Sequence, residues 1–392
     1  MYMLHLPPIP SPLETAGEPC YVMREAALRA NLALIREVSR RAGVEIILAF
    51  KAFALWQTFS VFREYIGSST ASSLYEARLG VQEMGAAVHT FTPAYTQQNI
   101  DQFRAMSSHL TFNSLSQYRQ FGTTPAVNAY GRPVSYGLRI NPEYSPVETD
   151  LYNPALPGSR FGVTADELAS EWPLKGIEGL HVHVLCEGDS YQLEELLDRL
   201  ERNFAPMLQG VKWLNLGGGH LMTRADYDTE HLVRLLQAFK ARHPHLHLIM
   251  EPGSAFAWQT GYLVSHVVDI VTHHGITTAL LDVSFTCHMP DCLEMPYKPV
   301  VRNAHQEPVP GLPTYTLGGC SCLSGDYIGS WSFNEPLQVG STVIFEDMIH
   351  YTTVKTNMFN GIHHPALVWE SQDGAFYLLK RFGYEDYKNR MD

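Results

Sequence analysis

Short apolar runs alternate with segments of helical spacing from the start of the chain to Met250. Each run has the length and composition of a strand buried on both faces, and most segments between them place apolar residues every three or four positions. Strands are expected at residues 46–50, 66–71, 87–92, 109–113, 135–141, 179–185, 213–216 and 247–250. Helices are expected at residues 21–39, 56–65, 97–106, 114–121, 191–204 and 227–242, and after Ser73, which has capping-box spacing to Glu76. The alternation predicts an α/β fold with a (β/α)8 TIM-like barrel, although a doubly wound sheet shares this pattern.

The pattern changes after Ala257. Strands are expected at residues 264–271, 277–282, 314–317 and 342–345, with turns rich in glycine and proline and little helical periodicity between them. The chain is therefore predicted to form a barrel over residues 21–260 and a mainly β domain from residues 1–20 and 261–392. Residues 141–158, with four prolines, are expected to form a flexible loop.

Composition and charge narrow the class of protein. With 392 residues, of which 45% are hydrophobic and 17% charged, the chain can bury a large core. No apolar run approaches the roughly 20 residues of a membrane-spanning helix, and the proline-rich start lacks the basic segment of a signal peptide, so a cytoplasmic location is predicted. The net charge of -12 argues against a nucleic-acid partner and suits a cationic substrate.

The chain has six cysteines, which are Cys20, Cys186, Cys287, Cys292, Cys320 and Cys322. In a large cytoplasmic protein they are expected to be free thiols. The two close pairs lack the C-x-x-C spacing of a structural zinc site, so no metal is predicted.

Lys51 directly follows the apolar run at residues 46–50. An ammonium group is rarely buried without a partner, so Lys51 either reaches solvent at the end of its strand or has a lowered pKa. A lysine with a lowered pKa at the carboxyl end of a barrel strand is the nucleophile that Schiff-base chemistry requires. The pattern of this stretch leaves both interpretations open.

Other residues with useful chemistry also stand where strands end. The sequence L-N-L-G-G-G-H at 214–220 could cradle a phosphate with its backbone N–H groups or form a plain turn. Glu251, in M-E-P-G-S, could hold the proton of a pyridine nitrogen or simply precede a Pro-Gly turn. His181 and His183 point to one face of a strand, where one could be a core residue and the other a ligand or a stacking surface. The loop G-C-S-C-L-S-G-D at 319–326 holds thiols that could act as general acids, or is a turn of small residues.

Six motifs in this order resemble the pyridoxal-phosphate-dependent decarboxylases of the alanine-racemase fold (fold type III), the group of the ornithine, diaminopimelate and carboxynorspermidine decarboxylases. They are A-F-K-A with Lys51, H-V-H-V with His183, L-G-G-G with Gly217 to Gly219, E-P-G with Glu251, C-x-S-G-D from Cys322 to Asp326, and E-D-M-x-x-Y with Tyr351. The resemblance covers nearly the whole chain. It implies a barrel, a mainly β second domain, pyridoxal 5'-phosphate as cofactor and a homodimer with shared active sites.

Within that group, several segments are similar to the carboxynorspermidine decarboxylases, which remove a carboxylate from a cationic polyamine precursor to make norspermidine or spermidine. The segments are A-S-S-L-Y-E-A at 71–77, H-V-H-V-L-C-E at 181–187, E-P-G-S-A-F at 251–256, H-M-P-D-C-L-E-M-P-Y at 288–297 and Y-T-T-V-K-T-N-M-F-N-G at 351–361. Two positions depart from the ornithine and diaminopimelate enzymes. Ser254 replaces an arginine that meets the phosphate, and Leu323 replaces an acidic residue.

The resemblance also implies roles for individual residues. Lys51 would bind the cofactor, His183 would stack on its ring, and Cys322 from the partner subunit would protonate the product carbanion. The remaining predicted cofactor contacts are Glu251, Gly217, Gly218, Gly219, Ser254, Tyr351 and Arg139. The carboxylates predicted to bind the substrate are Asp291 first, then Glu294, Asp326, Glu187 and Glu251.

Three alternatives remain at this point. The chain could decarboxylate diaminopimelate or another basic amino acid, which Ser254 and Leu323 disfavour. It could be a metal-dependent barrel hydrolase with His181 and His183 as ligands, which would leave Glu251 unexplained. It could also be a non-catalytic relative, against which the joint presence of Lys51, His183, Glu251 and Cys322 argues.

Overall fold

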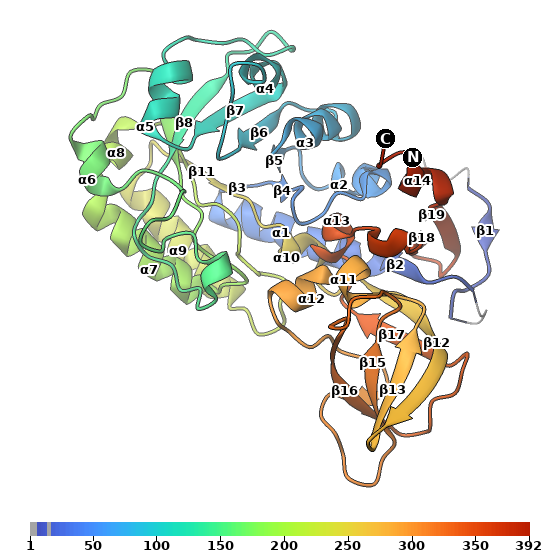
Figure 1. Cartoon of the computed structure of the whole chain (residues 1–392). Coiled ribbons are helices and arrows are strands. Elements are labelled where there is room, and N and C mark those ends of the chain that lie inside the picture. Colours follow the sequence, from blue (N-terminus) through green and yellow to red (C-terminus); the bar gives the residue numbers. More distant parts are fainter. Residues whose placement is uncertain (1–5, 14–16) are drawn as a thin grey trace. The chain divides into compact units, whose positions relative to one another are not determined.

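The computed structural model describes residues 6–13 and 17–392. The start of the chain at Met1–His5, predicted not to be a signal peptide, and residues 14–16 of the predicted β domain lie outside the described residues. The chain divides into two compact units, one of residues 31–256 and one of residues 1–30 with 257–392 (Figure 1). None of the described helices combines the length and the apolar composition that crossing a membrane requires.

The unit of residues 31–256 contains a parallel barrel. Its strands follow the order β3-β11-β10-β9-β8-β7-β6-β5-β4, and only Ile47 separates β3 from β4, so the ring closes. The strands are β3 (Glu45–Ile46), β4 (Leu48–Ala49), β5 (Ser69–Ala71), β6 (Val88–Phe91), β7 (Ser107–Phe112), β8 (Ser135–Arg139), β9 (Ile177–His181), β10 (Trp213–Asn215) and β11 (His247–Met250). The predicted barrel is confirmed, with the first predicted strand split into β3 and β4.

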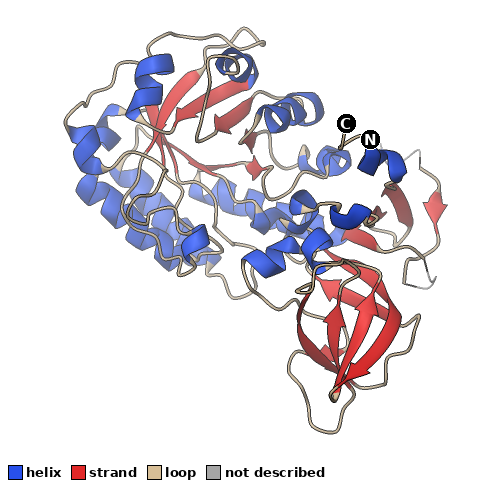
Figure 2. Cartoon of the chain, in the orientation of Figure 1, coloured by secondary structure: helices blue, strands red, loops and turns tan. Residues whose placement is uncertain are grey.

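Helices follow most of the strands and lie outside the ring (Figure 2). They are α1 (Glu25–Ala42), α2 (Phe59–Phe62), α3 (Leu74–Leu79), α4 (Ile100–Met106), α5 (Leu115–Gln117), α6 (Ala165–Ala169), α7 (Ser190–Asn203), α8 (Ala205–Gly210), α9 (Thr229–Arg242) and α10 (Ser254–Ala257). Ser73 caps α3 by accepting the Glu76 N–H, as its spacing predicted. The loop at 141–158 contains only a short 3-10 turn, Asp150–Tyr152.

A helix was predicted from residue 21, but the structure has strand β2 (Cys20–Arg24) there, and α1 begins only at Glu25. The reason is burial: residues 20–23 are all buried, which suits a strand covered on both faces, whereas the helical spacing of apolar residues starts at Leu28. Strand β2 lies in the unit of residues 1–30 and 257–392 and pairs there with β12 and β18, although the predicted barrel domain begins at residue 21.

The second unit is mainly β, as predicted. Its sheet has the order β1-β19-β18-β2-β12-β13-β15-β16-β14, and β17 pairs with β12. The strands are β1 (Pro8–Ile9), β12 (Gly261–His273), β13 (Ile276–Leu281), β14 (Ala304–His305), β15 (Thr314–Gly318), β16 (Tyr327–Phe333), β17 (Thr342–Glu346), β18 (Ala366–Glu370) and β19 (Phe376–Lys380). Its short helices are α11 (Phe285–His288), α12 (Pro290–Glu294), α13 (Thr352–Lys355) and α14 (Tyr384–Lys388).

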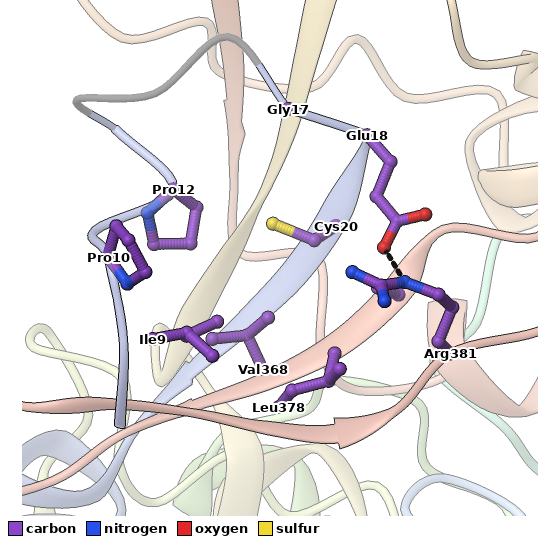
Figure 3. A pocket seen from close by; sticks show the side chains of 10 residues that line it. Ile9, Pro10, Pro12, Gly17, Glu18, Cys20, Val368, Leu378 and Arg381 are labelled. Carbon is purple, nitrogen blue, oxygen red and sulfur yellow. Dashed lines mark hydrogen bonds and ion pairs between the residues drawn. The ribbon is translucent and has the colours of Figure 1, made fainter. Parts of the chain in front are cut away.

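A pocket of about 230 Å³ opens beside β2, β18 and β19 (Figure 3). Its walls are mostly apolar, and the ion pair between Glu18 and Arg381 borders it. No residue predicted to bind cofactor or substrate lines this pocket. The pocket therefore belongs to the packing of the sheet rather than to the predicted chemistry.

The indole of Trp213 fills the inside of the barrel beside two glycines on neighbouring strands. A Cβ atom added at Gly179 would lie 1.9 Å from Trp213 Cδ2, and one at Gly137 would lie 2.2 Å from its Cη2. Strand pairing brings Gly179 opposite Trp213, so the indole cannot avoid a side chain at this position. Glycine at 179 is therefore required by close packing.

Replacing Gly179 by alanine is expected to destabilise the protein by about 2–3 kcal/mol, because the added methyl group overpacks the barrel interior. Urea denaturation monitored by circular dichroism would measure the change. Gly67→Ala is the matched control, because a Cβ atom there meets nothing within 4 Å. If the Gly179 variant lost no more stability than this control, the barrel interior would accommodate the added methyl group without overpacking.

Candidate active site

Four polar side chains stand at the carboxyl ends of four neighbouring strands. Arg139 ends β8, His181 ends β9, Asn215 ends β10, and Glu251 directly follows β11. These strands are parallel and adjacent, so their carboxyl ends meet at one rim of the barrel. All four side chains are buried there, with at most 8% of each residue exposed. The site is thus built on rigid strand ends.

Lys51 lies two residues past the end of β4 and contacts His183. The Lys51 Nζ atom is 3.2 Å from His183 Nε2, and the Gly218 backbone N–H donates to His183 Nδ1 at 2.7 Å. Because a backbone N–H can only donate, Nδ1 carries no proton, and a neutral imidazole must then carry its proton on Nε2. That proton points at the Lys51 nitrogen, which can accept it only as an uncharged amine.

The electrostatics of the site agree with this protonation state. Lys51 is exposed at the end of its strand, but desolvation by the surrounding protein still lowers its pKa, and Arg139 lowers it further, while Glu251 opposes both effects. Desolvation and the nearby Lys51 hold the pKa of His183 well below its usual value of 6.5. Both groups are therefore shifted toward their neutral forms, in which an amine is nucleophilic.

Glu251 is the anion of the site. Asn215 Nδ2 donates to Glu251 Oε1 at 2.6 Å, and His181 Nε2 lies 3.6 Å from Oε2. Burial works against the charged carboxylate, but His181 and Asn215 outweigh it and lower the pKa of Glu251 to about 2. The carboxylate is therefore ionised at neutral pH and can pair with a protonated ring nitrogen.

Arg139 supports the site from β8. Its guanidinium donates to the His183 backbone oxygen at 3.0 Å and lies over the rings of Phe91, at 4.6 Å, and Phe161, at 4.3 Å. Desolvation lowers the pKa of Arg139 to about 9, against the opposing effect of Glu251. These contacts fix Arg139 beside His183, and its predicted contact with the cofactor stays a prediction.

The glycine loop after β10 is shaped by close approach of the backbone. A Cβ atom at Gly217 would lie 2.4 Å from the Val182 oxygen, and one at Gly219 would lie 2.1 Å from the Leu185 oxygen. Both residues have positive φ values, 70° and 86°. The Gly217 N–H donates to Asn215 and the Gly218 N–H to His183, so the part of the loop that could receive a phosphate begins at Gly219.

Two further predicted residues of this unit lie at turns. Ser254 begins α10, and the preceding Gly253 packs against the Lys51 turn, where a Cβ atom would lie 2.3 Å from Ala52 Cβ. Glu187 is exposed and has a left-handed φ of 49°. The structure thus brings Lys51, His183, Gly218, Arg139 and Glu251 into one connected site, while the roles of Ser254 and Glu187 stay predictions.

The predicted general acid, Cys322, lies in a loop of the other unit. Cys322 is exposed, and its N–H donates to Asn360 Oδ1 at 2.8 Å. The carboxylate of Asp326 accepts the N–H groups of Thr286 and Ser321, both at 3.0 Å, and is 4% exposed. Asp326 therefore shapes the cysteine loop from within, and its predicted contact with substrate is untested.

Asp291 and Glu294 lie on α12 in the same unit. Both carboxylates bind Lys355 of α13, with 2.8 Å between Lys355 Nζ and Asp291 Oδ1. Tyr351, the predicted phosphate ligand, directly precedes α13 and has a φ of 52°. The sequence did not single out Lys355, because its acidic partners are 61 and 64 residues away along the chain.

The geometry does not suit the metal-hydrolase alternative. The rings of His181 and His183 lie 6.5 Å apart at 26°, and both nitrogens of His183 already contact Lys51 and Gly218. In the part of the chain that the structure describes, no group of three or more His, Cys, Asp or Glu side chains is arranged to hold a metal ion. His181 instead faces Glu251.

Buried neutral histidines make the barrel unit sensitive to acid. Burial lowers the pKa of His109 to about 3 and that of His220 to about 4, from 6.5. Because the unfolded chain binds these protons below pH 6.5 and the folded chain does not, stability is lost as the pH falls below 6.5. Each histidine should cost about 1.4 kcal/mol at pH 5.5, so the two together should cost about 3 kcal/mol.

Urea denaturation at pH 7.5 and pH 5.5 measures this loss. The wild-type protein should be less stable at pH 5.5, and a His220→Asn variant should lose about 1.4 kcal/mol less than the wild type between the two pH values. Equal stability of the wild type at both pH values would contradict the assignment of these histidines as neutral.

Comparison with known proteins extends these observations. The family model described as "Pyridoxal-dependent decarboxylase, C-terminal sheet domain" matches residues 20–349. The carboxyaminopropylagmatine decarboxylase of Synechocystis sp. is 50% identical over 97% of this chain and 96% of its own length. The carboxynorspermidine/carboxyspermidine decarboxylase of Campylobacter jejuni is 36% identical over 96% of this chain and 99% of its own.

Solved structures agree with these matches. The crystal structure of carboxynorspermidine decarboxylase from Campylobacter jejuni, complexed with norspermidine, has a TM-score of 0.85 and 35% identity. The match covers 95% of this chain and 99% of that one. Diaminopimelate decarboxylase from Helicobacter pylori, complexed with L-lysine, has a TM-score of 0.80 but 15% identity, over 97% and 98% of the two chains, and shows the fold alone.

Proposed function

This protein belongs to the pyridoxal-dependent decarboxylases, and we propose that it removes the carboxylate from carboxynorspermidine and carboxyspermidine to give norspermidine and spermidine. The observation that carries this proposal is the likeness to the Campylobacter jejuni enzyme over 96% of the chain. The chain's net charge of -12 suits a cationic substrate of this kind.

A second candidate substrate is carboxyaminopropylagmatine. The 50% identity to the Synechocystis enzyme named for it favours this substrate. The names of both candidate substrates describe a carboxylated aminopropyl group attached to an amine. The two substrates differ in the cation at the other end of the molecule, which is a guanidinium in the agmatine compound. Both proposals therefore involve the same decarboxylation. They differ in which cationic tail the side chains of the enzyme must recognise.

Diaminopimelate is less well supported. The diaminopimelate decarboxylase of Haemophilus influenzae is 26% identical over only 51% of this chain. Ser254 and Leu323 also differ from the arginine and the acidic residue that the diaminopimelate enzymes usually carry at these positions.

The residues of the barrel site fit the cofactor of the family. A lysine with a lowered pKa at position 51, an ionised Glu251 and a glycine loop without room for side chains are what pyridoxal 5'-phosphate needs at its aldehyde, ring nitrogen and phosphate. When bound, the cofactor supplies an electron sink for the pair left by departing carbon dioxide. Lys51 would hold it, and Glu251 would keep the ring nitrogen protonated.

The other residues would orient and transfer protons. His183 would lie against the ring, while Arg139 holds the His183 backbone by the hydrogen bond described above. Gly219, Ser254 and Tyr351 would bind the phosphate, Ser254 with a hydroxyl in place of the arginine of related enzymes. Cys322 would donate the proton that replaces the carboxylate.

We further propose a homodimer, in the cytoplasm, whose subunits share active sites, with Cys322 acting in the partner's site. The exposure of Cys322 and Leu323 in one loop supports a contact there. Asp291 is proposed first as the carboxylate that binds the substrate's tail, because it lies in the H-M-P-D segment that resembles the carboxynorspermidine decarboxylases.

Carbon dioxide release by the purified protein tests the proposal. Carboxynorspermidine, carboxyspermidine, carboxyaminopropylagmatine and diaminopimelate would be compared at equal concentrations. Turnover of one or more of the first three, with kcat/KM at least about 100-fold above that for diaminopimelate, is expected. Preference for diaminopimelate would overturn the proposed substrate class.

A further inference from the structure

His181 ends β9 at the rim of the barrel that carries the site, and its side chain is buried without a hydrogen bond. The residue is 2% exposed, and neither ring nitrogen has a hydrogen-bond partner among the described residues. Leaving a buried polar group unpaired is unfavourable, so most such groups in folded proteins find a partner. His183, two positions further on, uses its two nitrogens for Lys51 and Gly218. His181 is therefore the histidine of this pair that has hydrogen-bonding capacity left for the site.

A carboxylate oxygen of Glu251 lies beside the His181 ring. The distance between His181 Nε2 and Glu251 Oε2 is 3.6 Å, longer than the roughly 2.7–3.2 Å of an N–H···O hydrogen bond. The other oxygen, Oε1, accepts from Asn215 Nδ2 at 2.6 Å. Because β9, β10 and β11 are neighbours in the barrel, the three side chains stand in a row at the strand ends. A small rotation of either side chain would turn the contact of His181 with Glu251 into a hydrogen bond.

The surroundings of His181 favour a neutral imidazole that donates toward Glu251. Desolvation lowers the pKa of His181 below its usual value of 6.5, and Arg139 and Lys51 lower it further, while Glu251 opposes these effects. A neutral imidazole has one N–H donor and one acceptor nitrogen, whereas an ionised carboxylate can only accept. The proton of the ring therefore belongs on Nε2, the nitrogen that faces Glu251.

Such a donor would complete the support of the Glu251 carboxylate. Its two oxygens offer about four lone-pair positions, of which Asn215 fills one on Oε1. A hydrogen bond from His181 would fill one on Oε2, so that each oxygen is held from a neighbouring strand. A functional group held in this way keeps its orientation, and the remaining positions are open to a donor in the site. The protonated ring nitrogen of the cofactor is a donor of this kind.

We propose that His181 is a positioning residue, which donates its Nε2 proton to Glu251 and fixes the carboxylate for the protonated ring nitrogen of pyridoxal 5'-phosphate. The inference rests on the role proposed above for Glu251, and it does not depend on which substrate is decarboxylated. His181 acts through Glu251 rather than on the cofactor itself. Its effect therefore requires the ring nitrogen, and a cofactor without this nitrogen would gain nothing from His181.

Calorimetric titration of the full-length apoenzyme with two cofactors tests the proposal. The first is pyridoxal 5'-phosphate, and the second is its deaza analogue, in which a C–H group replaces the ring nitrogen. The wild type should bind the first about tenfold or more tightly than the second. In a His181→Leu variant this preference should fall about fivefold or more, while Kd for the deaza analogue changes less than about twofold. A His181→Gln variant should keep the preference within about threefold of the wild type, because its amide N–H can replace the Nε2 donor.

The matched control is His243→Leu, which removes a histidine that contacts a glutamate of the same unit outside the site. His243 Nε2 lies 2.8 Å from Glu201 Oε1. This variant should keep the wild-type preference between the two cofactors. Because both cofactors are titrated into the same preparation, an unfolded fraction lowers the two stoichiometries alike and leaves the ratio of the Kd values unchanged. An equal rise of both Kd values in His181→Leu, or no rise, would overturn the positioning role.

A Glu251→Gln variant separates this inference from the role proposed for Glu251. It should lower the preference for pyridoxal 5'-phosphate at least as much as His181→Leu does. A lowered preference in Glu251→Gln with an unchanged one in His181→Leu would leave the role of Glu251 standing and overturn that of His181. An unchanged preference in Glu251→Gln would overturn both roles. Carbon dioxide release from the candidate substrates succeeds or fails independently of these ratios.

Discussion

Replacing Lys51 by alanine is expected to lower kcat by about four orders of magnitude or more. Lys51 is the amine that His183 meets in its neutral form, at 3.2 Å, and alanine leaves no nitrogen to bind the cofactor. The visible absorption of the bound cofactor that borohydride bleaches should also disappear. Steady-state release of carbon dioxide and the spectrum of the purified variant measure the two effects.

A Lys175→Ala variant is the control, because Lys175 is exposed and lies outside the site. It should keep wild-type kcat and absorption. A Lys51 variant that retained more than about a tenth of wild-type activity would remove Lys51 from the chemistry, whatever its spectrum.

Replacing Glu251 by glutamine is expected to lower kcat by about 100- to 1000-fold, or roughly 3–4 kcal/mol. The substitution keeps the size of the side chain but removes the charge that His181 and Asn215 stabilise, which holds the pKa of Glu251 near 2. Without the anion, the cofactor's ring nitrogen would lose the partner proposed to keep it protonated, and the electron sink would be weakened. Kinetics and the affinity of the apoenzyme for pyridoxal phosphate would both be measured.

Glu230→Gln is the matched control, since Glu230 pairs with Arg41 on the surface. Its kcat should equal that of the wild type. If Glu251→Gln lowered kcat by less than about threefold, the carboxylate would not be the partner of the ring nitrogen.

The sequence predicted the barrel because parallel strands buried on both faces give uniform apolar runs, which alternate with amphipathic helices. It missed β2 because residues 20–23 run directly into α1, so that the apolar positions of a strand and a helix merge. It also missed β18 and β19, which pair with each other and join the sheet through β2 and β1. Such pairings join distant segments, and local periodicity does not report them.

The contrast between local patterns and contacts of distant segments also applies to the residues of the site. Lys51, His183 and Glu251 stand at or just past strand ends, where the sequence pattern left their roles open and the family resemblance supplied the predicted ones; the structure brings the side chains of Lys51 and His183 into contact. Asn215 was missed, because an asparagine at a strand end is common and its role depends on Glu251 from the next strand. The tautomer of His183 depended on the backbone of Gly218, which only the fold brings to it.

Reductive trapping with borohydride followed by peptide mass spectrometry shows whether Lys51 is the residue that holds the cofactor. The purified holoenzyme would be reduced, digested and searched for lysines that carry the pyridoxyl phosphate group. One modified site is expected, in the peptide that contains Lys51, and the modification should be lost after preincubation with excess carboxynorspermidine. Modification of a different lysine, or a reduced protein with no modified lysine, would contradict this expectation.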